Sequence, residues 1–318
     1  MHRIHLKMAS KDYAELGPLA GGDVALDGFE LTMARESVSA SELARRHPDA
    51  SIVETSFLLH LQQLARGDRT FVAVPVFFAR AFEHRSFYVL RDCNLQRLKD
   101  LEGRQIGVER WATTGNLWGR AALAEAGVRL DRVTWVEGPL LEAGVANCDV
   151  DTAGPSDRAP AGDPGLVQLL SAGRIDAIQS EAAPMNRIRN SDVRIVRLLT
   201  DAASAERQYF ERTGVFPAHH VLRVRRELAE ANPWVARHLV EAISASRARW
   251  LQCRQELADV TPWFADHLAS TTSLFGGDWA PHGIESNVAM LAALCEAAWN
   301  QGLISRRVDP AELFEFLD

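Results

Sequence analysis

Residues 71–78 read FVAVPVFF, an uncharged run rich in β-branched and aromatic side chains. Such a run is typical of a buried β-strand. Pro75 within it predicts an edge position or a bulge, because proline cannot donate a hydrogen bond to a neighbouring strand. Outward from this run, residues 49–54 (DASIVE) and 173–178 (GRIDAI) predict further strands, and 113–126 shows the apolar spacing of a helix. This alternation predicts an α/β protein.

The order of these elements predicts two lobes joined by a hinge. The length of 318 residues is sufficient for two domains of about 150 residues each. We expect a discontinuous first lobe, residues 1–91 plus 211–318, and an inserted second lobe, residues 92–210. The two crossovers near 88–92 and 208–215 form the expected hinge. Because small ligands bind in clefts between domains, the sequence predicts a ligand site in an interlobe cleft.

Composition excludes several classes of protein. Lys and Arg number 35 against 42 Asp and Glu, a net charge of −7, and no dense basic tract occurs, which argues against a nucleic-acid partner. No run approaches the roughly 18 apolar residues of a membrane span. The first residues lack the apolar run of a secretory signal, and Cys93, Cys148, Cys253 and Cys295 form no C-x-x-C pair. We therefore expect a cytoplasmic protein that binds a small molecule, with a homo-oligomer left open.

Several short motifs follow one another along nearly the whole chain. The most specific of them is Thr213-Gly214-Val215-Phe216-Pro217, which ends in His220. The others are Val74-Pro75-Val76-Phe77 with Arg80, Phe82 with His84, Thr114 with Trp118 and Arg120, Gly173-Arg174-Ile175-Asp176-Ala177, and Gly283-Ile284-Glu285 with Asn287. In this order and spacing the chain resembles the 4,5-dihydroxyphthalate decarboxylase family, which has the type 2 periplasmic-binding-protein fold.

The resemblance implies a carboxy-lyase that decarboxylates a hydroxylated aromatic carboxylate without oxidation. The chain departs from the family pattern at Phe78-Ala79, Glu83, His219 and His282, which leaves the exact substrate open. Two alternatives stand beside this interpretation. One is a non-catalytic binding protein for aromatic carboxylates, of the ABC-transporter type. The other is a different cytoplasmic enzyme on the same scaffold, because a fold alone does not fix a function.

Four residues are candidates for binding the substrate's carboxylate or another of its oxygens. Arg80 directly follows the run 71–78, where α/β sheets place ligand-binding residues, and its guanidinium fits a carboxylate bidentately; the alternative is a salt bridge. Thr113 and Thr114 begin a helix whose free N–H groups attract anions, although a capping role alone is the other interpretation. Ser56 either donates to a substrate oxygen or caps the next helix.

Two further candidates lie along the helix that begins at Thr113. Trp118 is four residues from Thr114 and so shares its face. It either stacks on the aromatic ring of a substrate or packs between the lobes. Arg120 points elsewhere, and a salt bridge explains it as well as substrate binding does.

Acid/base chemistry points to histidine and glutamate. Protonating a ring carbon needs an acid, and ionising a phenol needs a base. His84 and His220 match the family motifs and are expected to titrate near neutral pH. His219 and His220 are adjacent in a predicted strand, so they point to opposite faces, and the resemblance favours His220 for the cleft. Glu54 is the candidate base for the phenolic proton.

A metal site would need a third ligand beside two histidines. Glu54, Glu181 and His282 are conceivable in that role, but no spacing typical of metal ligands occurs in the chain. A well-placed acid and base are sufficient for this chemistry. We therefore predict no metal and no cofactor.

Overall fold

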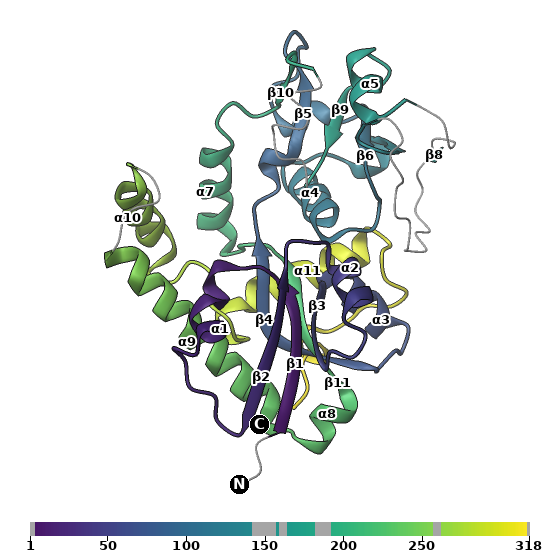
Figure 1. The fold of residues 1–318 in the computed structure, drawn as a ribbon. Helices are drawn as coiled ribbons and strands as arrows, with labels where there is room; N and C mark the ends of the chain where they lie inside the picture. Colours follow the sequence, from purple (N-terminus) through teal and green to yellow (C-terminus); the bar gives the residue numbers. More distant parts are fainter. Residues whose placement is uncertain (1–3, 142–156, 159–163, 182–191, 257–261, 317–318) are drawn as a thin grey trace. The chain divides into compact units, whose positions relative to one another are not determined.

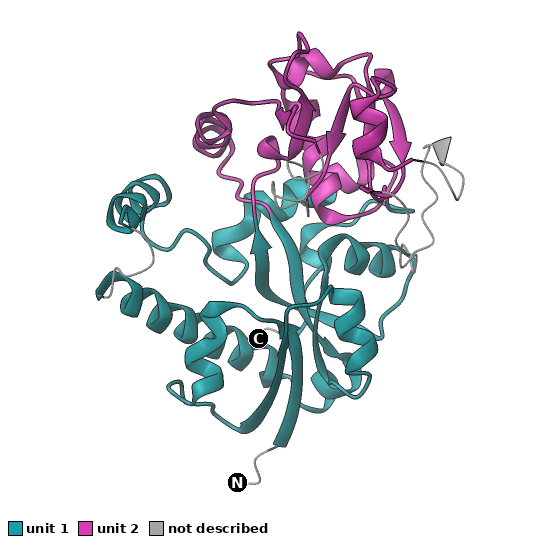
Figure 2. Ribbon diagram, turned by 45° about the horizontal axis from the view of Figure 1, so that its top comes forward, with its two compact units in different colours: residues 1–80, 218–295, 304–318 teal, residues 81–217, 296–303 magenta. Residues whose placement is uncertain are grey.

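The computed structural model describes residues 4–141, 157–158, 164–181, 192–256 and 262–316. The chain divides into two compact units, coloured separately in Figure 2. Unit 1 comprises residues 1–80, 218–295 and 304–318, and unit 2 comprises residues 81–217 and 296–303. The chain therefore passes from one unit to the other at 80/81, 217/218, 295/296 and 303/304.

Unit 1 is built on a five-stranded sheet of order β2-β1-β3-β11-β4 (Figure 1). Its strands are β1 (Ile4–Lys11), β2 (Phe29–Glu36), β3 (Ile52–Ser56), β4 (Phe71–Arg80) and β11 (Ala218–Arg225). Strand β1 runs parallel to β2 and to β3, whereas β11 is antiparallel to both β3 and β4. The sheet thus joins the beginning of the chain to a strand that follows the whole of residues 81–217.

The run FVAVPVFF forms most of β4, which is the edge strand of this sheet. It also carries a bulge, because Phe77 pairs with Val221 whereas Val74 pairs with the next residue, Leu222. Pro75 lies in the bulge, where it interrupts no regular hydrogen bond of the ladder. Both explanations that the sequence allowed for Pro75 are therefore confirmed.

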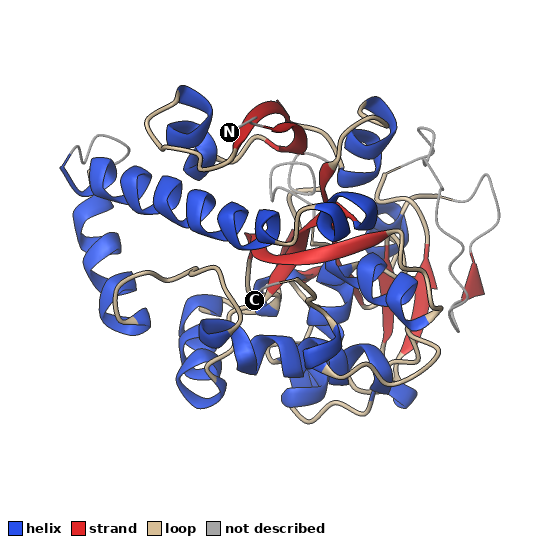
Figure 3. Cartoon of the chain, turned by 90° about the horizontal axis from the view of Figure 1, so that it is seen from below, coloured by secondary structure: helices blue, strands red, loops and turns tan. Residues whose placement is uncertain are grey.

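The helices of unit 1 are α1 (Gly17–Gly21), α2 (Ala40–Arg46), α3 (Phe57–Ala65), α8 (Arg226–Ala231), α9 (Trp234–Glu256), α10 (Phe264–Phe275) and the first part of α11 (Val288–Asn300). Most helices of unit 1 bury apolar residues in its core, whereas α10 buries none. The long helix α9 is continuous (Figure 3). Its residues Val235, Leu239 and Ile243 are fully buried in one core with Val74 and Val76 of β4. The core includes β4 residues as far as Phe78, two residues before Arg80.

Unit 2 is built on a six-stranded sheet of order β10-β5-β9-β6-β7-β8. Its strands are β5 (Phe87–Leu90), β6 (Gln105–Val108), β7 (Thr134–Glu137), β8 (Asp157–Arg158), β9 (Ala177–Gln179) and β10 (Ile195–Arg197), and its helices are α4 (Thr114–Glu125), α5 (Leu166–Ser171) and α7 (Ala202–Thr213). Strands β6 and β9 are parallel neighbours, so the segments that follow Val108 and Gln179 emerge at the same edge of the sheet.

The predicted α/β class is confirmed, and the lobe boundaries differ from those expected. Strand β5 pairs with β9 and β10, so it belongs to unit 2, whereas the sequence placed residues up to 91 in the first lobe. The expected second crossover, 208–215, falls on α7 and its Gly214 cap. Helix α7 lacks an apolar stripe, because its buried residues are Ala202, Glu206 and Tyr209, and apolar periodicity therefore does not reveal it.

Two expectations about composition concern the described part of the chain. Among the described helices, none combines the length and the apolar character needed to cross a bilayer. Cys93, Cys253 and Cys295 are free thiols, and Cys148 lies outside the described residues.

Candidate functional site

A buried carboxylate and a histidine meet on one face of the unit 1 sheet. Glu54 in β3 pairs with Leu222 of β11, and His220 lies two residues before Leu222, so the three share a face. Nδ1 of His220 is hydrogen-bonded to Oε1 of Glu54, whose residue is 1% exposed. His219 lies on the opposite face of the strand. Of the two adjacent histidines, the structure thus pairs His220 with a carboxylate.

Two more donors fix the Glu54 carboxylate. The backbone N–H of Lys11 donates to Oε2 at 2.7 Å, and the Tyr13 hydroxyl donates to Oε1 at 2.6 Å. The Tyr13 ring stacks on Phe78, with ring centroids 4.7 Å apart and planes 7° apart. Burial and the negative charge of Glu54 raise the pKa of Tyr13, which therefore keeps its proton and stays a donor. Three donors converge on one carboxylate, and its position is set by two strands and one aromatic stack.

This arrangement determines which atom of His220 can act on a ligand. Nδ1 faces Glu54, so Nε2 is the ring nitrogen that remains. In the neutral imidazole, the proton on Nδ1 donates to Glu54 and Nε2 carries the lone pair. When Nε2 is protonated as well, the buried carboxylate stabilises the imidazolium charge. The pair can therefore take up a proton at Nε2 and return it.

Ser56 is the last residue of β3 and pairs with His220. It occupies the N-cap position of α3, but its side chain does not cap that helix. The capping interpretation of Ser56 is therefore wrong.

Arg80 ends β4, directly after a turn of the backbone. Ala79 adopts a φ of 51°, a conformation that residues with a side chain rarely take. The guanidinium donates from Nη2 to the carbonyl of Pro281 at 3.0 Å and to Oδ1 of Asn287 at 2.6 Å. Burial, together with the nearby charge of Arg247, lowers the pKa of Arg80 to about 10, so it remains a cation. One of its terminal nitrogens thus anchors the segment 281–287, in which the family motif Gly283-Ile284-Glu285 lies.

His282, one of the conceivable metal ligands, is buried beside Arg80. Its Nδ1 accepts a hydrogen bond from the backbone N–H of Phe77 at 3.2 Å. Burial and the charges of Arg80 and Arg247 lower the pKa of His282 to about 3. The ring is neutral at pH 7, and the nitrogen that accepts from Phe77 is occupied. The structure therefore gives His282 a structural role in unit 1.

His84 lies in unit 2 among aromatic rings. Its ring centroid is 4.9 Å from that of Tyr209 and 6.4 Å from that of Phe82. The residue is 5% exposed, and burial lowers its pKa to about 4, with Arg212 and Arg85 adding to the effect. The expectation that His84 titrates near neutral pH is therefore wrong, because its aromatic surroundings disfavour the charged form.

The start of α4 is capped as the sequence allowed. Thr113 is the N-cap residue, and its hydroxyl accepts a hydrogen bond from the backbone N–H of Asn116 at 3.2 Å. Thr114 follows it as a buried residue. Beside this helix start lies a small pocket of about 50 Å³, lined by Glu109, Arg110, Thr113, Asn116, Gln179, Ser180 and Glu181. Helix α4 and the ends of β6 and β9 thus build one polar hollow within unit 2.

Trp118 and Arg120 of the same helix are buried. Trp118 is 2% exposed and Arg120 is 1% exposed. The Arg120 guanidinium lies over the Trp111 ring, 3.9 Å from its centroid, and donates to Oε1 of Gln301 at 2.7 Å and to the Trp111 carbonyl at 3.0 Å. Burial lowers the pKa of Arg120 to about 9. These hydrogen bonds join Arg120 to neutral partners, one of them in residues 296–303, and so differ from the salt bridge that stood as one of its two interpretations.

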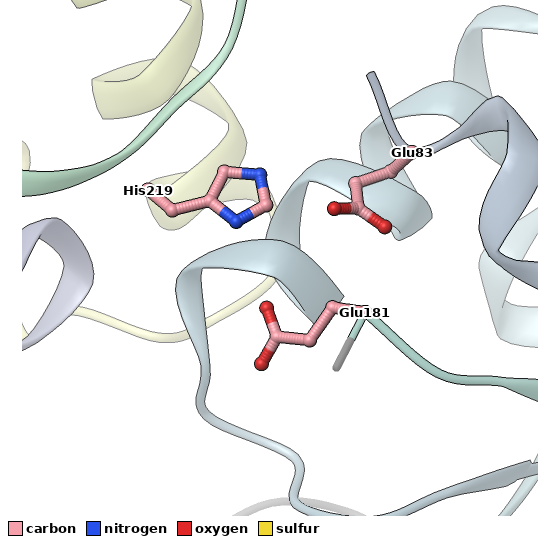
Figure 4. A group of neighbouring side chains, drawn as sticks. All are labelled: Glu83, Glu181 and His219. Atoms are coloured by element: carbon pink, nitrogen blue, oxygen red, sulfur yellow. The ribbon is translucent and has the colours of Figure 1, made fainter. Parts of the chain in front are cut away.

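A pair of carboxylates lies next to the pocket. Oxygens of Glu83 and Glu181, both in unit 2, approach within 4.8 Å of each other, and Figure 4 draws both side chains. Glu83 is 4% exposed, and burial together with the charge of Glu181 raises its pKa well above the ordinary value. The protonated form of Glu83 is therefore favoured over the charged form.

The sequence did not identify Tyr13, Glu83 and Gln179 as residues of these sites. Tyr13 and Gln179 stand in no motif, and Glu83 drew notice only as a departure from the family pattern. Each acquires its environment from residues distant in the chain, which periodicity does not report.

Comparison with solved structures identifies the fold of this chain. The desulfurization enzyme DSZB superposes with a TM-score of 0.57 at 18% identity, covering 99% of this chain and 98% of that one. The periplasmic aliphatic sulphonate binding protein SsuA from Escherichia coli gives 0.55 at 12% identity, covering 99% and 92%. An α/β chain of two units with these neighbours is a protein of the periplasmic-binding-protein fold class, as the sequence predicted.

Sequence comparison then gives the family. The chain is 32% identical to 4,5-dihydroxyphthalate decarboxylase of Comamonas testosteroni over 331 residues, which cover 99% of this chain and 97% of that protein. It is 33% identical over 191 residues to the enzyme of the same name from Pseudomonas putida, covering 58% and 73%. No family model matches the chain. The chain belongs to the 4,5-dihydroxyphthalate decarboxylase family, which confirms the resemblance seen in its motifs.

Proposed function

We propose that this protein is a carboxy-lyase that releases CO2, without oxidation, from a hydroxylated aromatic carboxylate. The observation that carries the proposal is the relation, along 99% of the chain, to a protein named 4,5-dihydroxyphthalate decarboxylase. We take 4,5-dihydroxyphthalate as the first substrate to test. The Glu54–His220 pair of unit 1 supports the proposal, because it offers the acid/base group that the reaction requires.

The chemistry replaces a carboxylate on the ring by a hydrogen. A hydroxyl para to that carboxylate gives up its proton, and the electron density of its oxygen moves into the ring. The ring carbon that bears the carboxylate then accepts a proton. The bond between this carbon and the carboxylate breaks, its electron pair restores the aromatic ring, and CO2 leaves. The phenolate finally regains a proton, so the net change is uptake of one proton and loss of CO2.

His220 is the residue to which we assign the proton transfer. Its Nε2 donates the proton to the ring carbon, and Glu54 stabilises the charged ring from Nδ1. Glu54 is itself enclosed by Lys11 N, Tyr13 and His220. We therefore propose that Glu54 acts through His220, in place of the direct role as base for the phenol that the sequence suggested.

For the other predicted residues, the surroundings in the structure decide which role we propose. Ser56 beside His220, Arg80 at the end of β4, and Thr113 and Thr114 at the start of α4 stay proposals for substrate contacts. His84 is neutral at pH 7, so we assign it at most a hydrogen bond. Burial of Trp118 and Arg120 favours packing as their role.

CO2 release tests the proposal directly. Purified protein is supplied with a panel of hydroxylated phthalates and benzoates, with and without a chelator. We expect turnover on a substrate with a hydroxyl para to a carboxylate, and a loss of about 10²–10⁴-fold in kcat for His220→Gln. His238→Gln, on α9 of the same unit, is the matched control and keeps wild-type activity. Tight binding across the panel without any CO2 release would instead establish the binding-protein alternative.

Location and assembly stay predictions. We propose a cytoplasmic enzyme, which fractionation of the native host tests. Sedimentation of the purified protein tests whether it forms a homo-oligomer.

A further inference from the structure

Phe78 lies beside both His220 and Tyr13 in unit 1. The residue is 1% exposed, and in the antiparallel pairing of β4 with β11 its partner is His220. Residues paired in this way point to the same face of the sheet, with Cβ atoms about 4.5–5.5 Å apart. The ring of Phe78 also stacks on that of Tyr13, with centroids 4.7 Å apart. Since Tyr13 donates to Glu54 and Glu54 is bonded to His220, the neighbours form a closed ring that includes Phe78.

The stack on Phe78 fixes the part of Tyr13 that its backbone leaves free. The N–H of Tyr13 donates to the carbonyl of Lys11 at 3.0 Å, and its carbonyl accepts a hydrogen bond at 3.1 Å from the helical turn that follows. Rotation of the side chain remains, and Tyr13 is only partly buried. Stacking restrains that rotation, because the two planes lie 7° apart. The stack therefore aims the hydroxyl at Oε1 of Glu54, the oxygen to which His220 is also bonded.

A second ring packs against Phe78. The ring of His282 meets it in a T-shaped arrangement, with centroids 5.9 Å apart and planes at 71°. Nδ1 of His282 accepts a hydrogen bond from the backbone N–H of Phe77 at 3.2 Å, so this ring is tied to β4 itself. Phe78 and His282 are two of the positions at which the chain departs from the family pattern. The contact between them is therefore a feature of this chain and not of the family pattern.

We propose that Phe78, held by His282, is a positioning residue for proton transfer at His220. It acts through Tyr13, whose hydroxyl it aims at Glu54. The hydroxyl and Nδ1 of His220 donate to the same carboxylate oxygen, so each bond weakens the pull of that oxygen on the other donor. The orientation of Tyr13 thereby sets how firmly Glu54 holds the imidazole. The inference rests on the proposed function and adds the residues that adjust its acid/base group.

A double-mutant cycle separates positioning from packing. Phe78→Leu removes the ring, and we expect kcat for CO2 release to fall about threefold to tenfold with KM within about twofold, the factor that one aromatic stack is worth. Tyr13→Phe keeps the stack and removes the hydroxyl. In the Tyr13→Phe background, Phe78→Leu should therefore change kcat by less than about twofold. Packing that is lost with the Phe78 ring is the same in both backgrounds, so losses that multiply would overturn the proposal.

Phe29→Leu is the matched control for this cycle. Phe29 is also 1% exposed, belongs to the same core as Phe78, and pairs with the Trp234 ring at 6.1 Å. The control loses a comparable amount of apolar contact and keeps wild-type kcat. A fall in kcat equal to that of Phe78→Leu would reduce the role of Phe78 to packing. Phe78→Met covers the case in which Phe78→Leu does not fold, because methionine fills the space without a ring and should give the same cycle.

Nuclear magnetic resonance adds a readout that does not depend on turnover. The ring nitrogens of His220 are observed after labelling with ¹⁵N-histidine, and they are assigned by the signals that His220→Gln lacks. We expect Phe78→Leu and Tyr13→Phe to displace the Nδ1 resonance in the same direction, and the double variant to displace it no further than Tyr13→Phe does. Phe29→Leu leaves the resonance in place.

The two readouts separate this inference from the proposed function. An Nδ1 resonance that stays in place in Phe78→Leu would overturn the positioning role. The expected displacements in a protein that releases no CO2 would support the arrangement around His220 while overturning the decarboxylase. CO2 release with a kcat that Phe78→Leu leaves unchanged would support the decarboxylase while overturning the positioning role.

Discussion

Replacing Glu54 by glutamine tests the central arrangement, because the substitution preserves shape and removes one charge. Glu54 accepts from three donors: Lys11 N at 2.7 Å, the Tyr13 hydroxyl at 2.6 Å, and Nδ1 of His220. Glutamine has one oxygen and one NH2 group, so its NH2 group faces either His220 and Tyr13 or the backbone N–H of Lys11. If the NH2 group faces His220, the imidazole carries its proton on Nε2, and the lone pair needed to take up a proton there is lost. If it faces Lys11, the bond to the backbone N–H is lost.

The size of the expected effect follows from these two orientations of the glutamine side chain. Losing a hydrogen bond to a charged group costs about 1.5–3 kcal/mol of stability. Losing the stabilised imidazolium and the correct tautomer costs more in the transition state, about 10²–10⁴-fold in kcat, the usual contribution of general acid–base catalysis. We expect kcat for CO2 release to fall by that factor, with the melting temperature lowered by several degrees.

The matched control is Glu30→Gln, an exposed carboxylate in β2 of the same sheet. It keeps wild-type turnover and stability. A folded Glu54→Gln protein whose kcat stays within threefold of the wild type would refute the assigned role of the pair, whatever the substrate proves to be.

Three further predictions use other contacts. Tyr13→Phe removes one of the three donors to Glu54 and is expected to lower kcat about tenfold with KM within twofold; an unchanged kcat in steady-state assays would remove Tyr13 from the site. His84 has a pKa of about 4 in the folded protein against 6.5 for an ordinary histidine, so the unfolded state takes up its proton first as the pH falls, and up to about 3 kcal/mol of stability disappears between pH 6.5 and 4. His84→Gln should flatten denaturation free energies across that window, and an equally steep profile would contradict the burial argument. Gly119→Ala places a Cβ against Nε2 of Gln179 and should destabilise the protein by about 1–3 kcal/mol in chemical denaturation, although alanine favours helices, whereas Gly17→Ala has open space and should be neutral or stabilising.

Local sequence patterns predicted the strands of the runs 49–54, 71–78 and 173–178 and the helix that begins after Thr113, but not the short strands β8 and β10 or helix α1. The run FVAVPVFF predicted an edge strand or a bulge because proline removes one hydrogen-bond donor. Proline lacks this backbone N–H in any tertiary structure, so the prediction depends on the sequence alone. Helix α7 was not predicted, because its buried side includes Glu206, which pairs with Arg85, and presents little apolar surface. A helix held by an ion pair and one tyrosine leaves no periodic apolar signal.

The sequence predicted which residues belong to the candidate site, but it predicted the roles of those residues only in part. Glu54 and His220 were both named, but their pairing joins positions separated by 166 residues through strand register, which single-sequence reasoning cannot supply. His84 was named as a titrating group, and burial among Phe82 and Tyr209 reverses that expectation. The roles of ionisable residues depend on desolvation and charge partners, which arise only in the folded chain.

The position of β11 in the middle of the unit 1 sheet has a consequence for biosynthesis. Strands β3 and β4 are neighbours only through β11, which the ribosome supplies more than a hundred residues after β4. Until β11 is synthesised, the sheet of the nascent N-terminal segment is incomplete. The carboxylate of Glu54, which is buried in the folded protein, then has no His220 to pair with. Residues 81–217, which make up unit 2 apart from 296–303, are contiguous and are synthesised before β11. Because closing such a distant pair is slow, the proton-transfer group should be among the last features of the enzyme to assemble, and recovery of activity during refolding should lag behind recovery of secondary structure.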